Sequence, residues 1–357
     1  MICLGIESTA HTLGVGICRR TGKNIRVLAN EKSMYKPPAG QGILPRAAAD
    51  HHGENFLPVL SRALATAGVK LSDVGLFSFS QGPGIGQCLR VSCSGAKYLA
   101  SKYKKPLVGV NHCAAHLEIS RGLLGMQDPL YVYVSGANTQ LIVGNEASAR
   151  KSMQAANVMH GTGRTRNSAV QQNASSVRTP CYSVLGETLD MGLGNLFDVF
   201  AREAKFAYPH GSEVAKLAGE GKYFPLPYTV KGMNFAFAGL LTSAVREVGV
   251  RRTEDICHSL METAFAELCE AAERALCLTG KHEVTVCGGV AQNARFCEML
   301  SLVAKEHGAR FGAVAPEYNA DNGAMIAYTG ILEHARGKKE DINALAPNGY
   351  WRIDEVY

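Results

Sequence analysis

Residues 1–29 read MICLGIESTAHTLGVGICRRTGKNIRVLA and contain three apolar runs separated by short polar turns. The runs lie at residues 2–6, 13–18 and 25–29, and each has the length of a β-strand. Turns this short join strands that are neighbours in a sheet. The chain therefore opens with a predicted meander of three strands.

The residues that follow alternate between helical and strand patterns. Apolar positions recur at helical spacing over 47–67, and later segments predict a strand at 74–79, a helix at about 88–103, a strand at 107–110 and a helix at about 113–123. A three-stranded meander followed by alternating helices and strands is typical of a ribonuclease-H-like unit, in which helices cover both faces of a mixed sheet.

The second part of the chain repeats this opening. Apolar runs at 130–135 and 140–144 flank the turn GANT, and a later strand at 283–287 leads into GGVAQN and a helix that ends at about residue 307. The first part has an equivalent strand followed by QGPGIG. Two copies of one unit around a central nucleotide cleft predict an α/β protein with the actin-like ATPase fold.

We expect the chain to divide into two ribonuclease-H-like subdomains and a tail. Residues 1–125 form the expected N-terminal subdomain, and residues 126–335 form the C-terminal one with a helical insert at about 188–255. The tail, residues 336–357, is expected to pack back on the fold.

Residues 146–178 differ in composition from the rest of the chain. They are rich in Ala, Ser, Asn and Gln, contain no aromatic residue, and hold five Arg or Lys against one Glu. A stretch with so few apolar residues cannot bury a core of its own. We interpret it as a disordered insertion in the hairpin between 140–144 and 182–185, with a flexible RNA-binding arm as the alternative interpretation.

Charge and composition indicate a globular chain without a membrane segment. The 357 residues include 37 basic and 31 acidic side chains, and the net charge of +6 allows a nucleic-acid partner without requiring one. Eleven cysteines are scattered without a CxxC pair, which favours reduced thiols over disulfides or zinc. The start lacks a signal-peptide pattern, and no apolar run reaches membrane-spanning length. We expect a soluble, cytoplasmic protein with no membrane partner.

Three turns that follow apolar strands have the composition of phosphate-binding loops. They are Glu7-Ser8-Thr9, Ser135-Gly136-Ala137-Asn138-Thr139 and Gly288-Gly289-Val290-Ala291. Small residues allow backbone N–H groups to point at an anion, and hydroxyl groups add donors. One such turn is equally typical of an ordinary hairpin. Three at equivalent places in a duplicated fold predict nucleotide binding, with supporting phosphate loops at Ser8, Thr9, Gly288 and Gly289.

The sequence His112-Cys113-Ala114-Ala115-His116 opens a predicted helix directly after a strand. Histidines at i and i+4 share one helical face, so both imidazoles can reach one ion, although a pair of hydrogen-bonded histidines is the alternative. Asp321 and Tyr133 are further ligand candidates, with a helix N-cap and a buried aromatic residue as their alternatives. The glutamate of an HExxH motif is missing, which disfavours a metallopeptidase.

Motifs along nearly the whole chain, apart from 146–178, resemble the TsaD/OSGEP (Gcp) family of universal threonylcarbamoyladenosine transferases. The likeness is strongest to the archaeal member, the catalytic subunit of the KEOPS complex. The segments that carry it are GIESTAHTLGVGI, HHGENFLPVL, QGPGIGQCLRV, PLVGVNHCAAHLEI, YVSGANTQLI, GETLD, GNLFDVFARE, LPYTVKGMNFAFAGLLT, GGVAQN and DNGAMIAYTG.

This resemblance implies the reaction. Family members transfer the threonylcarbamoyl group of threonylcarbamoyl-AMP to the exocyclic amine of the adenosine beside the anticodon, in tRNAs that read ANN codons, and release AMP. A mixed anhydride is already activated, so no covalent nucleophile is expected and no catalytic base is assigned. The implied partners are tRNA and KEOPS-type subunits, namely a small atypical protein kinase, a small dimerising subunit and an auxiliary subunit.

The resemblance also implies the ligands and the residues that hold them. One divalent metal, with iron or zinc favoured over magnesium or manganese, is expected at His112, His116, Tyr133 and Asp321. The adenine nucleotide, threonylcarbamoyl-AMP or ATP, is expected at Tyr133, Val134, Ser135, Gly136, Ala137, Asp198, Gly211 and Asn293.

Two substitutions depart from the family pattern. Ala137 replaces a glycine, which costs about 1 kcal/mol if the position requires positive φ. Ala215 stands where the family has a glutamate, and Glu213 is a candidate substitute. The alternative functions are an actin-like ATPase or small-molecule kinase that uses the same cleft, and a non-catalytic scaffold whose site has decayed.

Overall fold

The computed structural model describes residues 1–38, 42–145, 181–338 and 340–357. The segment 146–178, interpreted from composition as a disordered insertion, lies outside the described residues. Within the described ranges, none of the helices combines the length and the apolar character needed to cross a lipid bilayer.

The first sheet contains the predicted meander. Its strands are β1 (Ile2–Glu7), β2 (Thr12–Thr21), β3 (Asn24–Met34), β4 (Leu76–Gly82) and β5 (Leu107–Asn111), in the order β3-β2-β1-β4-β5. β1, β2 and β3 pair antiparallel, whereas β4 and β5 run parallel to β1. The carboxyl ends of β1, β4 and β5 therefore meet at one edge of the sheet, where sites of α/β proteins form.

The second sheet repeats this topology. Its strands are β6 (Leu130–Val134), β7 (Thr139–Gly144), β8 (Tyr182–Glu187), β11 (Glu283–Cys287) and β12 (Arg310–Ala313), in the order β12-β11-β6-β7-β8. β6, β7 and β8 pair antiparallel, and β11 and β12 run parallel to β6. The predicted duplication of one unit is confirmed, although no apolar pattern predicts β12.

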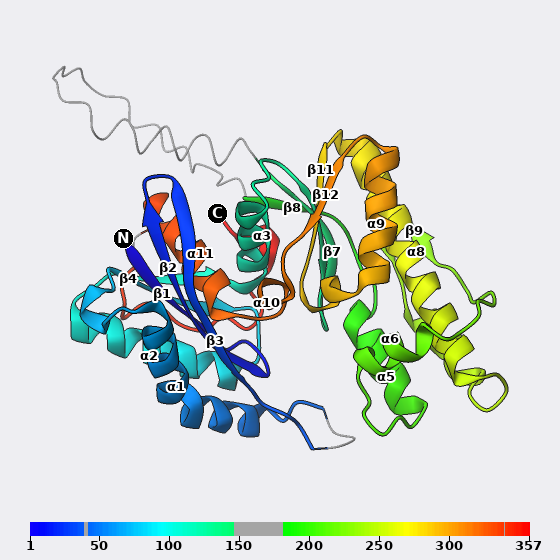
Figure 1. Cartoon of the computed structure of the whole chain (residues 1–357), viewed down its shortest axis with the longest axis horizontal. Coiled ribbons are helices and arrows are strands. Elements are labelled where there is room, and N and C mark those ends of the chain that lie inside the picture. Colours follow the sequence, from blue (N-terminus) through cyan, green and yellow to red (C-terminus); the bar gives the residue numbers. More distant parts are fainter. Residues whose placement is uncertain (39–41, 146–180, 339) are drawn as a thin grey trace, which may run out of the picture.

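Helices cover both faces of each sheet (Figure 1). On the first sheet, α1 (Pro45–Ala67) and α2 (Gly86–Tyr103) pack on one face, and α11 (Gly323–Ala335) packs on the other. On the second sheet, α8 (Thr253–Thr279) and α9 (Ala294–Glu306) cover one face. The opposite face of the second sheet packs against α3 (His112–Leu123), which lies between the two sheets in Figure 1.

The packing of α11 differs from the division expected from sequence. This helix belongs to the segment 126–335, yet it completes a core of the first sheet. Glycines permit the close approach: a Cβ atom added at Gly5 would lie 2.2 Å from the Ala327 nitrogen, and one added at Gly16 would lie 2.1 Å from the Ala324 nitrogen. A boundary at residue 126 thus follows chain order rather than packing.

The remaining elements join these layers. Between β8 and α8 lie α5 (Leu193–Glu203), α6 (Gly211–Ala218), β9 (Val230–Lys231), β10 (Asn234–Phe235) and α7 (Ala238–Arg246). The short helices are η1 (Leu71–Asp73), η2 (Gly289–Gln292), α10 (Pro316–Asn319) and η3 (Ile353–Glu355). The residues after α11 contact both halves, since Asn348 donates to the Gln81 carbonyl and Cys181 donates to the Val356 carbonyl.

Candidate metal and nucleotide site

The two histidines of the site come from the start of α3. This helix begins directly after β5, and the Asn111 side chain caps it by accepting the Ala114 N–H at 3.0 Å. His112 and His116 are one turn apart, and their ring centroids lie 4.8 Å apart. Both side chains are buried. The predicted sharing of one helical face is confirmed.

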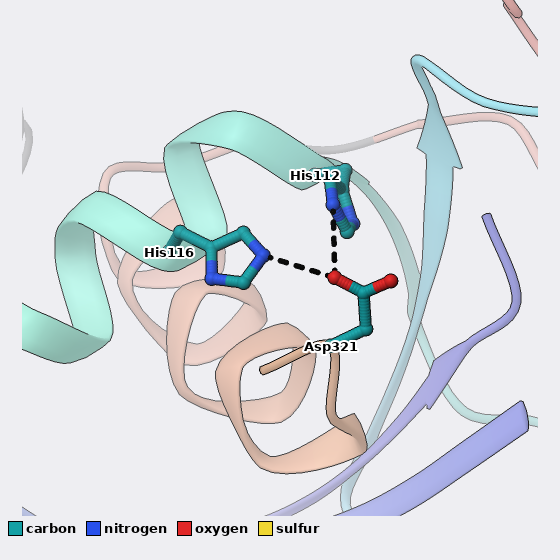
Figure 2. A group of neighbouring side chains, drawn as sticks. All are labelled: His112, His116 and Asp321. Atoms are coloured by element: carbon teal, nitrogen blue, oxygen red, sulfur yellow. Dashed lines mark hydrogen bonds and ion pairs between the residues drawn. The ribbon is translucent and has the colours of Figure 1, made fainter. Parts of the chain in front are cut away.

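Asp321 reaches the histidines from the turn between α10 and α11. The N-cap of α11 is Asn322, whose Oδ1 accepts the Met325 N–H at 2.9 Å and whose amide donates to the Ala320 carbonyl at 2.7 Å. The alternative that Asp321 merely caps this helix is therefore wrong. Its carboxylate faces His112 and His116 instead (Figure 2).

The three side chains form one compact group. Asp321 Oδ1 lies 3.3 Å from His116 Nε2 and 3.5 Å from His112 Nε2. One potential ligand atom from each of the three residues lies within 4.8 Å of the others. Segments that are 205 residues apart in sequence thus converge on one point (Figure 2).

Glu7 is a fourth charged group at this point, and sequence reasoning assigned it no such role. It ends β1, is fully buried, and its Oε2 lies 3.0 Å from His112 Nδ1. Because the carboxylate accepts the proton on Nδ1, Nε2 is the ring nitrogen that faces Asp321. The role of Glu7 could have been inferred from parallel pairing of β1, β4 and β5, since this pairing brings the end of β1 close to the start of α3.

The electrostatics of the group favour a bound cation. Burial alone would lower the pKa of His112, but the carboxylates of Glu7 and Asp321 outweigh it and raise the pKa to about 9. Burial lowers the pKa of His116. Burial would raise the pKa of Asp321, but the two imidazoles hold it well below its usual range. Two carboxylates thus retain a proton on His112, and a metal ion can replace that proton.

The residues present fit a divalent metal. Two imidazoles and a carboxylate are a common donor set for zinc and non-haem iron. Among the described residues, His116 Nδ1 is a buried polar atom without a hydrogen-bond partner, so the present contacts do not satisfy this imidazole. The trio of two buried histidines and a partly buried aspartate therefore has the donor chemistry and the compactness of a metal site.

Tyr133 lies beside this trio on β6. Its ring centroid is 5.6 Å from that of His116, and its side chain is buried in a cluster with Cys113 and Cys287. Burial raises the pKa of the Tyr133 phenol well above its usual value. A phenolate ligand would therefore require the charge of a metal to offset burial, and this role stays a prediction.

A buried ion-pair network joins α3 to α11 outside the trio. Glu118 accepts hydrogen bonds from Arg121, from Arg336 at 3.0 Å and from the Tyr182 hydroxyl at 2.9 Å. Burial would raise the pKa of Glu118, but the two guanidinium groups lower it to about 2. This network fastens the helix with the two histidines to the helix that follows Asp321.

The turn after β6 is held by the start of α5. Gly194 and Asn195 donate their N–H groups to the carbonyls of Ser135 and Gly136, at 3.1 and 3.0 Å. Among the described residues, Lys104 and Lys205 are the non-glycine residues with positive φ, so Ala137 adopts an ordinary conformation. The expected backbone cost of Ala137 does not arise.

The turn after β11 adjoins the same place. Gly288 has φ of 97°, and a Cβ atom there would lie 2.3 Å from the carbonyl oxygen of Val134, so only glycine fits. Asn293 caps α9 by accepting the Phe296 N–H at 3.1 Å. Any ligand contact of this side chain would therefore use its amide donors. The N–H group of Gly289, the first residue of η2, has no acceptor inside that short helix.

The turn after β1 has a different role in this structure. Ser8 donates its N–H to Ser80 Oγ at 3.0 Å and its hydroxyl to the Cys88 carbonyl at 2.8 Å. The Thr9 N–H is hydrogen bonded to Glu7 Oε1. These contacts fix the position of Glu7, and a phosphate contact of Ser8 and Thr9 stays a prediction.

Two further predicted nucleotide residues contact each other. Asp198 on α5 accepts the N–H of Gly211, the first residue of α6, at 2.7 Å. Burial raises the pKa of Asp198, although the Gly211 N–H and the imidazoles of His210 and His11 oppose this rise. Whether these residues contact a nucleotide stays a prediction.

Comparison with known proteins relates this geometry to a family. The family model described as TsaD, tRNA N6-adenosine threonylcarbamoyltransferase, matches residues 26–161 and 167–328. The tRNA N6-adenosine threonylcarbamoyltransferase of Thermococcus kodakarensis is 46% identical over 359 aligned positions, which cover 100% of this chain and 98% of that protein.

This chain belongs to the TsaD family.

Other family members align over similar lengths. The tRNA N6-adenosine threonylcarbamoyltransferase of Thermofilum pendens is 44% identical over 99% of this chain and 95% of its own. A protein of Methanococcus maripaludis, named as a probable bifunctional tRNA threonylcarbamoyladenosine biosynthesis protein, is 43% identical over 100% of this chain but only 59% of its own.

Solved structures support the fold of this TsaD family member. The crystal structure of HypF from T. kodakarensis has a TM-score of 0.58 at 12% identity, over 94% of this chain and 48% of HypF. Component A of the Acidaminococcus fermentans (R)-2-hydroxyglutaryl-CoA dehydratase has a TM-score of 0.51 at 12% identity, over 94% and 99%. With the repeated strand order, these likenesses confirm the predicted actin-like ATPase fold.

Proposed function

We propose that this chain transfers the threonylcarbamoyl group of threonylcarbamoyl-AMP to the exocyclic amine of the adenosine beside the anticodon of tRNAs that read ANN codons. A bond forms between N6 of the adenine and the carbamoyl carbon, the bond from that carbon to the AMP phosphate breaks, and the amine loses a proton. The observation that carries this proposal is 46% identity over the full length of a transferase of that name.

The metal site of this enzyme is proposed to comprise His112, His116, Asp321 and Tyr133. The compactness of the trio supports the first three ligands, and the proximity of Tyr133 to His116 supports the fourth. A bound divalent ion supplies Lewis-acid stabilisation of oxygen charge. The donor set favours iron or zinc over magnesium or manganese. Glu7 orients His112 through its Nδ1 atom, and this orientation sets which nitrogen is offered as a ligand.

The nucleotide part of the substrate, threonylcarbamoyl-AMP or ATP, is proposed to lie between the turns after β6 and β11 and the start of α6. The proposed contacts are Tyr133, Val134, Ser135, Gly136, Ala137, Asp198, Gly211 and Asn293, with supporting phosphate loops at Ser8, Thr9, Gly288 and Gly289. Contacts of α5 with the Ser135–Ala137 turn and the close approach of Gly288 to Val134 support this arrangement. Fixed amides would hold the leaving AMP without reorganisation during the reaction.

A decayed scaffold has little support. The ordinary backbone of Ala137 removes one of its three arguments, and Ala215 and the segment 146–178 remain. Along the chain, the proposed subdivision is 1–125, then 126–335 with a helical insert at about 188–255, then 336–357 as a tail, although α11 of the second part packs on the first sheet.

Partners and location follow from the family. We propose a tRNA substrate, a cytoplasmic location and a KEOPS-type assembly with a small atypical kinase, a small dimerising subunit and an auxiliary subunit. The bifunctional name of the M. maripaludis relative, which is much longer than this chain, supports a second activity from the same pathway as a close partner.

The test is product formation. Purified chain with its partner subunits is given threonylcarbamoyl-AMP and unmodified tRNA, and modified adenosine is detected by mass spectrometry of the digested tRNA. The proposal predicts modified adenosine that depends on both substrates. Absence of product, under conditions in which the T. kodakarensis relative is active, would contradict it. Consumption of ATP with no tRNA present would favour an ATPase or kinase instead.

A further inference from the structure

The loop between α5 and α6 exposes a stacked pair of aromatic rings. The ring centroids of Tyr208 and His210 lie 5.5 Å apart with an angle of 29° between the rings. Tyr208 is 61% exposed, and His210 is exposed as well. Core packing does not explain this pair, because neither ring is buried.

The His210 imidazole is held in place by the helix that follows. It is the N-cap of α6, and its Nδ1 accepts the Ser212 N–H at 3.2 Å. The Ser212 hydroxyl lies 2.9 Å from the same nitrogen. A ring fixed in this way loses little further freedom when it binds a flat ligand.

A lysine in the same loop has an unfavourable backbone conformation. Lys205 has φ of 57° at the end of α5, where the Phe206 N–H bonds to the Ala201 carbonyl at 2.9 Å. Glycine is the usual residue at this position of a helix end, because a side chain is strained there. Lys205 is exposed and forms no ion pair within the described part of the chain. An available cation thus occupies a position where glycine would be more stable.

The loop adjoins the proposed nucleotide residues. Gly211 follows His210 directly and donates to Asp198. The other end of α5 holds the turn at Ser135 and Gly136. α5 also contacts η2, and η2 contacts α10, the element that precedes Asp321. The exposed rings therefore lie at the edge of the proposed nucleotide site, in the loop that joins α5 to α6.

We propose that Tyr208 and His210 form a stacking platform for an unpaired base of the tRNA anticodon loop, and that Lys205 contacts a neighbouring phosphate. Single-stranded RNA is bound by aromatic rings that stack on its bases and by cations that follow its backbone. Exposed tyrosine, histidine and lysine present polar tips and a charge, which fits RNA better than an apolar protein surface. This inference rests on the proposed function, because it names how that site receives its tRNA.

The test is RNA binding by full-length variants. The probe is a fluorescent anticodon stem–loop with an unmodified adenosine beside the anticodon, and its Kd is measured by anisotropy for wild type, Tyr208→Ala, Tyr208→Phe and Tyr223→Ala. Tyr223 is the matched control, a 57% exposed tyrosine of the same half. We expect Tyr208→Ala to raise the Kd about tenfold, the effect of losing one stacked base, while Tyr208→Phe and Tyr223→Ala stay within about twofold of wild type. AMP binding should be unchanged in all four proteins.

Other results would overturn the inference. One such result is that Tyr208→Ala binds the RNA as tightly as wild type, and another is that Tyr223→Ala loses as much RNA affinity as Tyr208→Ala. A loss of AMP affinity in Tyr208→Ala, or no RNA binding by wild type, would also overturn it. Loss of a partner subunit from Tyr208→Ala with unchanged RNA affinity would assign the loop to a protein contact and would also overturn it. Modified adenosine formed by wild type and Tyr208→Ala with the same KM for tRNA would leave the proposed function intact and contradict only this inference.

Discussion

Glu7 Oε2 lies 3.0 Å from His112 Nδ1, so a buried carboxylate at the end of the first strand orients an imidazole at the start of α3. The opposite nitrogen of the same ring faces Asp321. A ligand whose second nitrogen is fixed by a carboxylate keeps one tautomer and one orientation. Glu7 therefore belongs to the site, although it contacts Nδ1 of His112 and not the nitrogen that faces Asp321.

We expect Glu7→Gln to weaken metal binding by about 10- to 100-fold, since a neutral amide orients the ring less well and removes the charge that supports it. The measurement is metal affinity by competition with a chelator of known affinity. Glu31→Gln, which alters an exposed hydrogen bond with Thr66, is the control and should bind metal as wild type does. Equal affinity in Glu7→Gln and Glu31→Gln would show that Glu7 does not orient the ligand.

Variants of two helix caps distinguish an effect on stability from an effect on metal binding. Asn322→Ala and Asn293→Ala each remove a side-chain cap, from α11 and from α9, and each should lower the free energy of unfolding by about 1 kcal/mol. Asn322 also holds the turn that carries Asp321, so only Asn322→Ala should lose metal affinity. Chemical denaturation and metal titration of both variants check this. Equal metal affinity in the two variants would mean that the cap does not position Asp321.

Glycine in β2 controls how α11 docks. Gly16→Ala would place a Cβ atom 2.1 Å from the Ala324 backbone nitrogen, and we expect a loss of about 1–3 kcal/mol or more because backbone must move. Gly53→Ala is the control, since nothing lies within 4 Å of a Cβ there and the residue is inside α1. It should stabilise the protein by up to about 1 kcal/mol. Thermal melts of both variants test the sign of each change.

Glu267 on α8 should make stability depend on pH. Burial raises its pKa from 4.5 to about 7, and its Oε2 is buried without a partner among the described residues. The folded state therefore favours the protonated acid, and the contribution of this group is fully present below about pH 4.5 and lost as pH rises to about 7. Glu267→Gln mimics the protonated form, so its melting temperature should exceed that of wild type at about pH 8 and match it at about pH 4.5. A constant difference at both pH values would contradict the assigned pKa.

The sequence predicts the fold because its two halves repeat local patterns. Apolar runs and short turns identify nine of the ten strands of the two large sheets, and the strand orders follow once both halves are read as one unit. β12 escapes prediction because it is short and only partly buried. The docking of α11 on the first sheet also escapes prediction, since it depends on glycines that face each other across elements far apart in sequence.

The site, like the fold, is predictable where its residues form a local pattern in the sequence. His112 and His116 are visible as a local i, i+4 pair and Asp321 as a carboxylate in the turn before an apolar helix, whereas only the family resemblance selects Tyr133 as a ligand. The role of Glu7 cannot be predicted from local sequence, because it depends on which strands are neighbours. Local sequence does not determine whether Asp321 or Asn322 caps α11, because the two residues are adjacent and both can act as caps.

We expect His112, His116 and Asp321 to hold one metal ion. Elemental analysis of purified wild type, His112→Ala and Asp321→Ala tests it most directly, with circular dichroism to verify that each variant is folded. We expect about one equivalent of metal in wild type and a nearly complete loss in both folded variants. Metal content that is the same in all three proteins would contradict it.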